Sequence, residues 1–191
     1  VLAGPYASMY LGDFGADVVK VEPPSGDETR AWTPPRDERG ESAYFASVNR
    51  NKRAVRLDLA DADDLAQARE LALGADIVLE NFRPGVMERF GLGYEQLAAD
   101  NPRVIYGSVT GFGREAALPG YDFLVQGLSG LMSITGSPDG EPAKVGVAVV
   151  DVLTGLNLVT GVLAALHERG RSGRGQRIEV SLLGSALAGL V

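Results

Sequence analysis

The repeated order of strand and helix in the first half of the chain is the feature that most constrains its fold. Short apolar runs typical of strands occupy four segments, at residues 16–22, 53–59, 76–80 and 104–109. Helical spacing is found between them, at residues 62–73 and 94–99. Strands that alternate with helices at this spacing pair in parallel, with right-handed crossovers. The sequence therefore predicts an α/β fold, an open parallel sheet flanked by helices.

Sheets of this kind bind ligands beyond the carboxyl ends of their strands. We therefore expect the loops after Glu22, Glu80 and Val109 to lie on the ligand side.

The remaining segments are helical at the start of the chain and mostly helical in its second half. The spacing of apolar residues predicts helices over residues 5–14, 121–135 and 153–168. Residues 169–176 are basic and glycine-rich and predict a turn, followed by a strand at 177–183 and a further helix.

Composition excludes several kinds of chemistry. The 191 residues include no cysteine, so disulfides and thiolate catalysis are excluded. The single histidine, His167, leaves little for a Ser-His-Asp triad or a histidine-rich metal site, and we predict no metal. A net charge of −7 argues against a nucleic-acid partner, which requires a concentrated basic face.

The apolar segments are short, so we expect no membrane partner. No signal peptide precedes the first predicted helix, and we expect a cytoplasmic protein. The chain opens at Val1 without Met and stops in the apolar residues 186–191. We expect it to be a fragment of a longer protein.

Asp151 is the acidic residue with the most distinctive position. It follows the apolar run 145–150 and precedes the helix predicted from residue 153. One interpretation is an N-cap, because Asp accepts hydrogen bonds from first-turn N–H groups. The other is a nucleophile, because a helix N-terminus favours an ionised carboxylate. Composition alone favours the N-cap over a catalytic role, although the two roles are compatible.

Several motifs, in this order, carry a resemblance. They are LAGP at 2–5, LGDFGADVVKVE at 11–22, NRNKR at 49–53, ENFRPGV at 80–86 and GRGQ at 173–176. As a set they resemble family III CoA-transferases, which include formyl-CoA transferase, carnitine CoA-transferase and α-methylacyl-CoA racemase. The resemblance covers essentially the whole chain.

The resemblance implies a Rossmann-like large domain. Residues 1–191 would then be a partial CoA-binding domain, without the small domain and the returning C-terminal segment. Members of the family are interlocked homodimers, so a homodimer is implied here as well.

By the same resemblance, Asp151 is the catalytic residue, whose carboxylate attacks an acyl-CoA thioester to form a mixed anhydride and then an aspartyl-CoA thioester. The resemblance implies CoA and acyl-CoA as substrates, a small carboxylic acid as the acceptor, and no permanently bound cofactor. The CoA contacts it implies are Leu2, Ala3, Leu57, Asp58, Leu59, Ala60, Asn81, Phe82, Arg83, Arg89, Pro119, Gly120, Tyr121 and Asp122. Trp32, Tyr44 and Tyr121 align with residues of the acyl pocket.

Two alternatives remain. The racemase branch of the family has a histidine where this chain has Tyr121, and a phenol is a poor base at neutral pH, which favours transfer. The other alternative is a non-catalytic nucleotide-binding domain. The chain lacks a G-x-G-x-x-G loop after its first predicted strand, which argues against that class.

Overall fold

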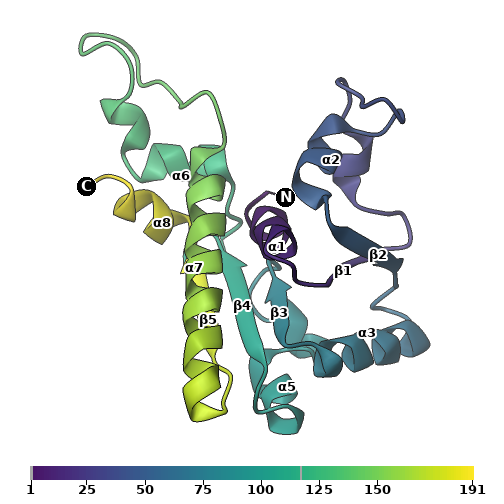
Figure 1. Cartoon of the computed structure of the whole chain (residues 1–191). Helices are drawn as coiled ribbons and strands as arrows, with labels where there is room; N and C mark the ends of the chain where they lie inside the picture. Colours follow the sequence, from purple (N-terminus) through teal and green to yellow (C-terminus); the bar gives the residue numbers. More distant parts are fainter. Residues whose placement is uncertain (1, 117) are drawn as a thin grey trace.

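The computed structural model describes residues 2–116 and 118–191 and confirms the α/β class with parallel strands flanked by helices. Within that part of the chain, the strands form two sheets, with the orders β1-β2 and β3-β4-β5 (Figure 1). Every strand pair is parallel.

The elements follow one another along the chain with these bounds. The strands are β1 Val18–Glu22, β2 Lys52–Arg56, β3 Ile77–Glu80, β4 Ile105–Thr110 and β5 Arg177–Ser181. The α-helices are α1 Ala3–Asp13, α2 Ala43–Asn49, α3 Ala62–Gly74, α4 Val86–Arg89, α5 Tyr94–Asp100, α6 Asp122–Leu128, α7 Val149–Ser172 and α8 Leu182–Ala188. The short 3-10 helices are η1 Glu28–Ala31 and η2 Leu131–Ile134.

The long helix α7 covers one face of the β3-β4-β5 sheet (Figure 1). Alternate residues of a strand point to opposite faces, so Ile105 and Val109 of β4 pack into the same core as Leu158 and Val162 of α7. Gly107 lies between them, where a Cβ atom would come 2.8 Å from the Leu158 side chain. The small residue therefore lets α7 lie close to the sheet.

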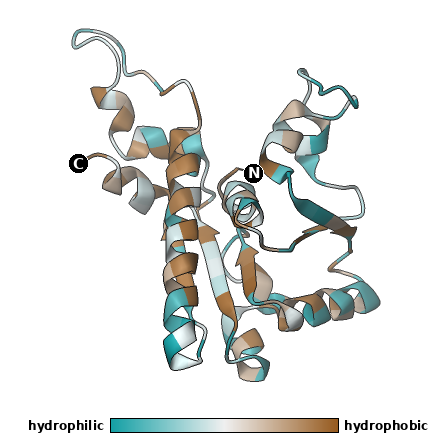
Figure 2. Cartoon of the chain, viewed as in Figure 1, coloured by the Kyte–Doolittle hydropathy of each residue, from teal (hydrophilic) through white to brown (hydrophobic). Residues whose placement is uncertain are grey.

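A second core fills the opposite face of the sheet. Tyr106, on the other side of β4, packs there with Leu97 of α5 and with Leu57 and Met87. Figure 2 shows hydrophobic colouring on β3, at both ends of β4 and along the N-terminal part of α7. The central sheet is thus buried on both faces, as parallel sheets commonly are.

Helix α7 is also long and apolar enough to cross a membrane by length and composition alone, unlike the short apolar segments expected from the sequence. In this structure it packs against α1, β4, β5, α6 and α8, and Val150, Leu158 and Val162 are fully buried. Figure 2 shows its C-terminal turns to be hydrophilic. The position of α7 in the core accounts for its apolar composition.

Several boundaries differ from the predicted ones. The predicted helix 121–135 is divided into α6 and η2, because Gly130 has a positive φ of 86°. Helix α7 begins at Val149 instead of residue 153. It also continues through the first half of the predicted basic turn to Ser172, and its C-cap is Gly173, whose φ is 74°.

Candidate functional site

A cleft of about 240 Å³ lies at the carboxyl end of the β3-β4-β5 sheet. Its walls come from the ends of β3 and β4, the N-termini of α1, α7 and α8, and the segment before α6. The lining residues are Ala3, Asn81, Phe82, Arg83, Pro84, Val109, Thr110, Gly111, Leu118, Pro119, Gly120, Tyr121, Asp122, Asp151 and Leu182. This position matches the expectation for the loops after Glu80 and Val109.

Asp151 lies in the first turn of α7 and lines this cleft. The interpretation of Asp151 as an N-cap is wrong, because α7 begins two residues earlier and its N-cap position is Ala148. No side chain at the N-cap position accepts a hydrogen bond from the helix. The Asp151 carboxylate is therefore not used as a cap.

Asp122 takes over part of the missing cap. Its Oδ2 accepts a hydrogen bond from the backbone N–H of Asp151 at 2.9 Å. Its Oδ1 accepts from Nε2 of Gln126 at 2.5 Å, and Oε1 of Gln126 accepts from the N–H of Val145 at 2.8 Å. Because Gln126 is only 2% exposed, this chain of bonds fixes Asp122 and the start of α7 together.

Burial raises the pKa of Asp151 to about 6 from its ordinary value of 3.8, and the nearby Asp122 carboxylate acts in the same direction. Desolvation makes the ionised carboxylate less stable and therefore a stronger base than an exposed one. Above pH 6 it is still mostly ionised. The residue combines a nucleophilic oxygen with higher basicity than a surface carboxylate has.

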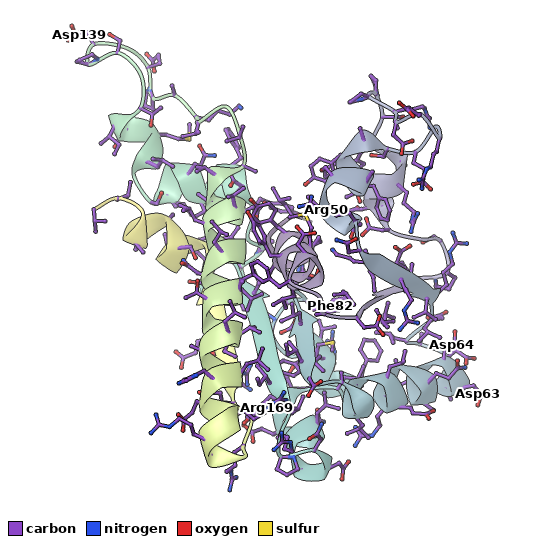
Figure 3. All side chains as sticks on the ribbon, in the orientation of Figure 1. Arg50, Asp63, Asp64, Phe82, Asp139 and Arg169 are labelled. Atoms are coloured by element: carbon purple, nitrogen blue, oxygen red, sulfur yellow. The ribbon has the colours of Figure 1, made fainter. Side chains whose placement is uncertain are left out.

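The turn after β3 forms the wall beside Asp151. Asn81, Phe82 and Arg83 are exposed and line the cleft, and their contacts with CoA remain predictions. The ring of Phe82, labelled in Figure 3, is 48% exposed. An exposed aromatic face next to a guanidinium group suits a ligand that carries both an aromatic base and phosphates.

A contact between two glycines holds the opposite wall in place. A Cβ atom on Gly120 would lie 2.2 Å from Cα of Gly111, and one on Gly111 would lie 2.5 Å from Cα of Gly120. Only glycine at both positions allows this approach. The turn with Pro119 and Gly120 is thereby held against the end of β4. Tyr121 follows it and is 64% exposed.

Helix α1 brings Ala3 into the cleft. Gly155 of α7 lies against the first turn of α1, where an added Cβ would be 2.9 Å from the carbonyl oxygen of Ala3. This close crossing places the N-terminus of α1 beside the N-terminus of α7. Leu2, the N-cap residue of α1, is adjacent but does not line the cleft.

The other predicted CoA contacts lie away from this cleft. Leu57 is 4% exposed and belongs to the second core, while Asp58 and Ala60 are exposed beyond β2 and Leu59 packs on that core. Arg89 is exposed at the end of α4. Their predicted contacts with CoA remain predictions.

Trp32 and Tyr44, the other two predicted pocket residues, lie together. Their ring centroids are 5.0 Å apart, and Trp32 is 45% exposed. Burial raises the pKa of Tyr44, and the negative charge of Asp151 raises it further. Neither residue lines the described cleft, so their predicted contacts with the acyl group remain predictions.

Four further residues line the cleft that the sequence did not single out: Thr110, Gly111, Leu118 and Leu182. Thr110 and Gly111 follow Val109 directly. The expectation that ligands bind beyond the carboxyl ends of parallel strands therefore pointed to their position. Leu182 gave no signal, because an apolar residue at a helix start looks like an ordinary core residue. Within residues 2–116 and 118–191, no group of three His, Cys, Asp or Glu side chains could hold a metal ion.

The sequence profile described as "CoA-transferase family III" matches residues 1–191. The succinate–glutarate CoA-transferase of Agrobacterium fabrum is 49% identical over 96% of this chain and 48% of its own length. The acetyl-CoA:oxalate CoA-transferase of Acetobacter aceti is 45% identical over 98% of this chain and 49% of its own. The chain therefore spans about half the length of these relatives.

A solved structure agrees with these sequence matches. The crystal structure of a CAIB/BAIF family protein from Brucella suis superposes with a TM-score of 0.95 and 45% sequence identity, over 100% of this chain and 52% of that one. Together with the profile over all residues, these similarities establish that the chain belongs to CoA-transferase family III.

Proposed function

We propose that the protein containing this chain transfers CoA from an acyl-CoA donor to a carboxylic acid, with Asp151 as the nucleophile. The observation that carries the proposal is the position of Asp151. It is a half-buried carboxylate on the wall of an open cleft, and its charge is used by no ion pair within residues 2–116 and 118–191.

The proposed reaction needs only this carboxylate and the two substrates. A carboxylate oxygen of Asp151 attacks the thioester carbonyl carbon. The C–S bond breaks, CoA departs as a thiolate, and a mixed anhydride remains on Asp151. The thiolate attacks the aspartyl carbonyl, which releases the donor acid and forms an aspartyl-CoA thioester. The acceptor carboxylate then attacks that thioester and displaces the thiolate, which forms a second anhydride. Attack of the thiolate on the acceptor carbonyl gives the new acyl-CoA and frees Asp151.

The rest of the cleft supports CoA as the ligand. Arg83 offers a guanidinium group for phosphate oxygens, and Phe82 offers an exposed ring for stacking on adenine. The turn with Pro119 and Gly120 forms the other wall, on which a pantetheine arm would pass toward Asp151.

We infer that the acceptor is a small dicarboxylic acid. Relatives that match 96–98% of this chain are named for succinate, glutarate and oxalate. Trp32 and Tyr44, whose rings lie together and which the resemblance aligns with the acyl pocket, are the candidate residues for contacts with the acyl group. Activity with a panel of C2 to C5 dicarboxylates tests this inference, and a preference for branched monocarboxylates would contradict it.

Racemisation of α-branched acyl-CoA is the second candidate activity. It needs a base on each side of Cα, and Tyr121 occupies the position where the racemase branch has histidine. Solvent deuterium incorporated at Cα of an acyl-CoA, without CoA transfer, would favour racemisation over transfer.

The decisive experiment uses the full-length protein. It is incubated with acyl-CoA, trapped with hydroxylamine or borohydride, and the modified residue is mapped by mass spectrometry. Modification of Asp151, and its loss in Asp151→Ala, is the expected result. A trapped adduct on another carboxylate, or unchanged transfer by Asp151→Ala, would refute the assignment.

We further infer that the full-length protein is a cytoplasmic homodimer. The homodimer is supported by large apolar side chains that α6 and its surroundings expose. Phe123, Leu128 and Ile134 have exposed fractions of 60%, 61% and 72%. Light scattering on the full-length protein is expected to give twice the monomer mass, and fractionation is expected to find it outside membranes.

A further inference from the structure

A small polar cavity lies on the face of the sheet opposite α7, directly beneath the Asn81–Arg83 turn. Its volume is about 10 Å³, and its walls include Glu80, Ser108 and Arg177. The strand register explains the grouping, because Glu80 of β3 pairs with Ser108 of β4, and Ser108 pairs with Glu179 of β5. These side chains therefore form a polar row across three strands.

Two polar atoms in this cavity lack a partner among residues 2–116 and 118–191. The hydroxyl oxygen of Ser108, a residue only 2% exposed, and Nε of Arg177 are both buried without a hydrogen bond. Arg177 uses one of its other nitrogens on Glu179, at 2.7 Å. Buried polar groups are rarely left unsatisfied, and a cavity of this volume holds one water molecule.

Glu80 connects this cavity to the cleft. Its Oε2 accepts a hydrogen bond from the backbone N–H of Phe82 at 2.8 Å, which holds the first residues of the turn. Glu80 is half-buried, and burial raises its pKa, while the neighbouring Ser108 hydroxyl and the N–H of Phe82 act in the opposite direction. Glu88 and Arg114 also line the cavity, and they form an ion pair at 3.4 Å.

We propose that one internal water molecule binds between Ser108, Arg177 and the carboxylate of Glu80, and that Glu80 so held is a positioning residue for the Asn81–Arg83 turn. The water donates to Glu80 and accepts from Arg177, while Ser108 completes its shell. The carboxylate then keeps its second oxygen directed at the N–H of Phe82. The inference rests on the proposed function, in which the Asn81–Arg83 turn contacts CoA.

The test uses the full-length protein and measures CoA binding by calorimetry together with kcat and KM. Glu80→Ala removes the acceptor and is expected to weaken CoA binding and raise KM about ten-fold, while kcat changes less than about two-fold. Glu80→Gln keeps an oxygen for the N–H of Phe82 and is expected to restore most of the affinity. Glu70→Gln, an exposed residue of α3, is the matched control and is expected to behave as wild type.

The outcomes separate the inference from the proposed function. If wild type binds CoA and Glu80→Ala binds it equally well, the positioning role is wrong and the proposed function stands. If wild type binds no CoA, the proposed function is wrong and the positioning role is wrong as well. The water is tested independently by a high-resolution crystal structure. An ordered water within about 3.2 Å of Ser108 Oγ and Arg177 Nε is expected, its loss in Ser108→Ala would support the site, and a dry cavity in wild type would overturn it.

Discussion

At the scale of single residues, the environment of Asp151 favours reactivity over stability. Burial raises its pKa in the folded protein from 3.8 to about 6, so the folded state binds a proton more tightly than the unfolded state does. Stability is therefore lost as pH rises from about 4 to about 6, and the cost is fully present above pH 6. A residue kept at such a cost is typical of a functional site.

Asp151→Asn is accordingly expected to raise the melting temperature at pH 7.5, by an amount corresponding to on the order of 1–3 kcal/mol, and to raise it less at pH 4. Transfer activity is expected to fall by at least about 1,000-fold. Differential scanning calorimetry and a thioester exchange assay measure the two effects. Asp139→Asn, at an exposed residue labelled in Figure 3, is the control and is expected to change neither. A lower melting temperature for Asp151→Asn at pH 7.5 would contradict the electrostatic argument.

The same pKa predicts how activity depends on pH. For the full-length protein, kcat/KM is expected to rise with pH and level off, with its midpoint near 6, because only the ionised Asp151 attacks. Asp122→Asn removes a repelling charge and still offers an oxygen to the N–H of Asp151, so the midpoint is expected to move lower. A midpoint near 4 in wild type would show that Asp151 is not desolvated in the working enzyme.

At the scale of elements, the strand and helix order could be predicted, whereas the exact start of α7 could not. The order follows from periodic burial, which each segment shows by itself. The start of α7 depends on Asp122, which lies 29 residues earlier than Asp151 and accepts a hydrogen bond from its backbone N–H. Likewise, η2 is separated from α6 by a single left-handed glycine, Gly130, in a run whose apolar spacing is otherwise helical.

The crossing of α1 and α7 gives a prediction at this scale. Gly155→Ala puts a Cβ atom against the carbonyl of Ala3 and is expected to destabilise the fold by about 1–3 kcal/mol and to raise KM, since Ala3 lines the cleft. Gly170→Ala, in the same helix with open space around it, is the matched control. It is expected to stabilise the protein by about 0.5–1 kcal/mol. Chemical denaturation of both variants measures the difference, and equal effects would mean that the crossing is not tight.

At the scale of the whole molecule, the cleft is assembled from segments that are far apart in sequence. The residues that meet there include Ala3, Asn81, Thr110, Asp122 and Asp151. Patterns in a single sequence do not predict which of these distant segments lie close together in space. The resemblance to a family supplied their grouping, because motifs in a fixed order imply a shared fold. It did not separate the residues that line this cleft from those, such as Leu57, that support it from the core.

Among the residues that the structure describes, the β1-β2 sheet shares no strand pair with β3-β4-β5, so other contacts hold the two sheets together. Lys52, the first residue of β2, makes one of them. Its ammonium group donates to the carbonyl oxygens of Pro5 and Val48, each at 2.8 Å, and to Oδ1 of Asn49 at 3.0 Å. A single side chain thereby ties α1, α2 and β2 together. Figure 1 shows α1 between the two sheets, where such a tie is most effective.

Lys52→Met is therefore expected to destabilise the full-length protein by about 2–4 kcal/mol, because buried carbonyl groups lose their donor. Burial lowers the pKa of Lys52 to about 7, so the buried charge costs stability as pH falls toward 7 and offsets part of what its hydrogen bonds contribute. The comparison is made at pH 6, where the ammonium group keeps three protons to donate, and the destabilisation is expected to be larger at pH 8. Lys144→Met, at an exposed position, is the control and is expected to be neutral. Limited proteolysis is expected to cut the loop over residues 33–41 faster in Lys52→Met alone. Equal protection in both variants would mean that the β1-β2 sheet is held to α1 by packing and not by this ammonium group.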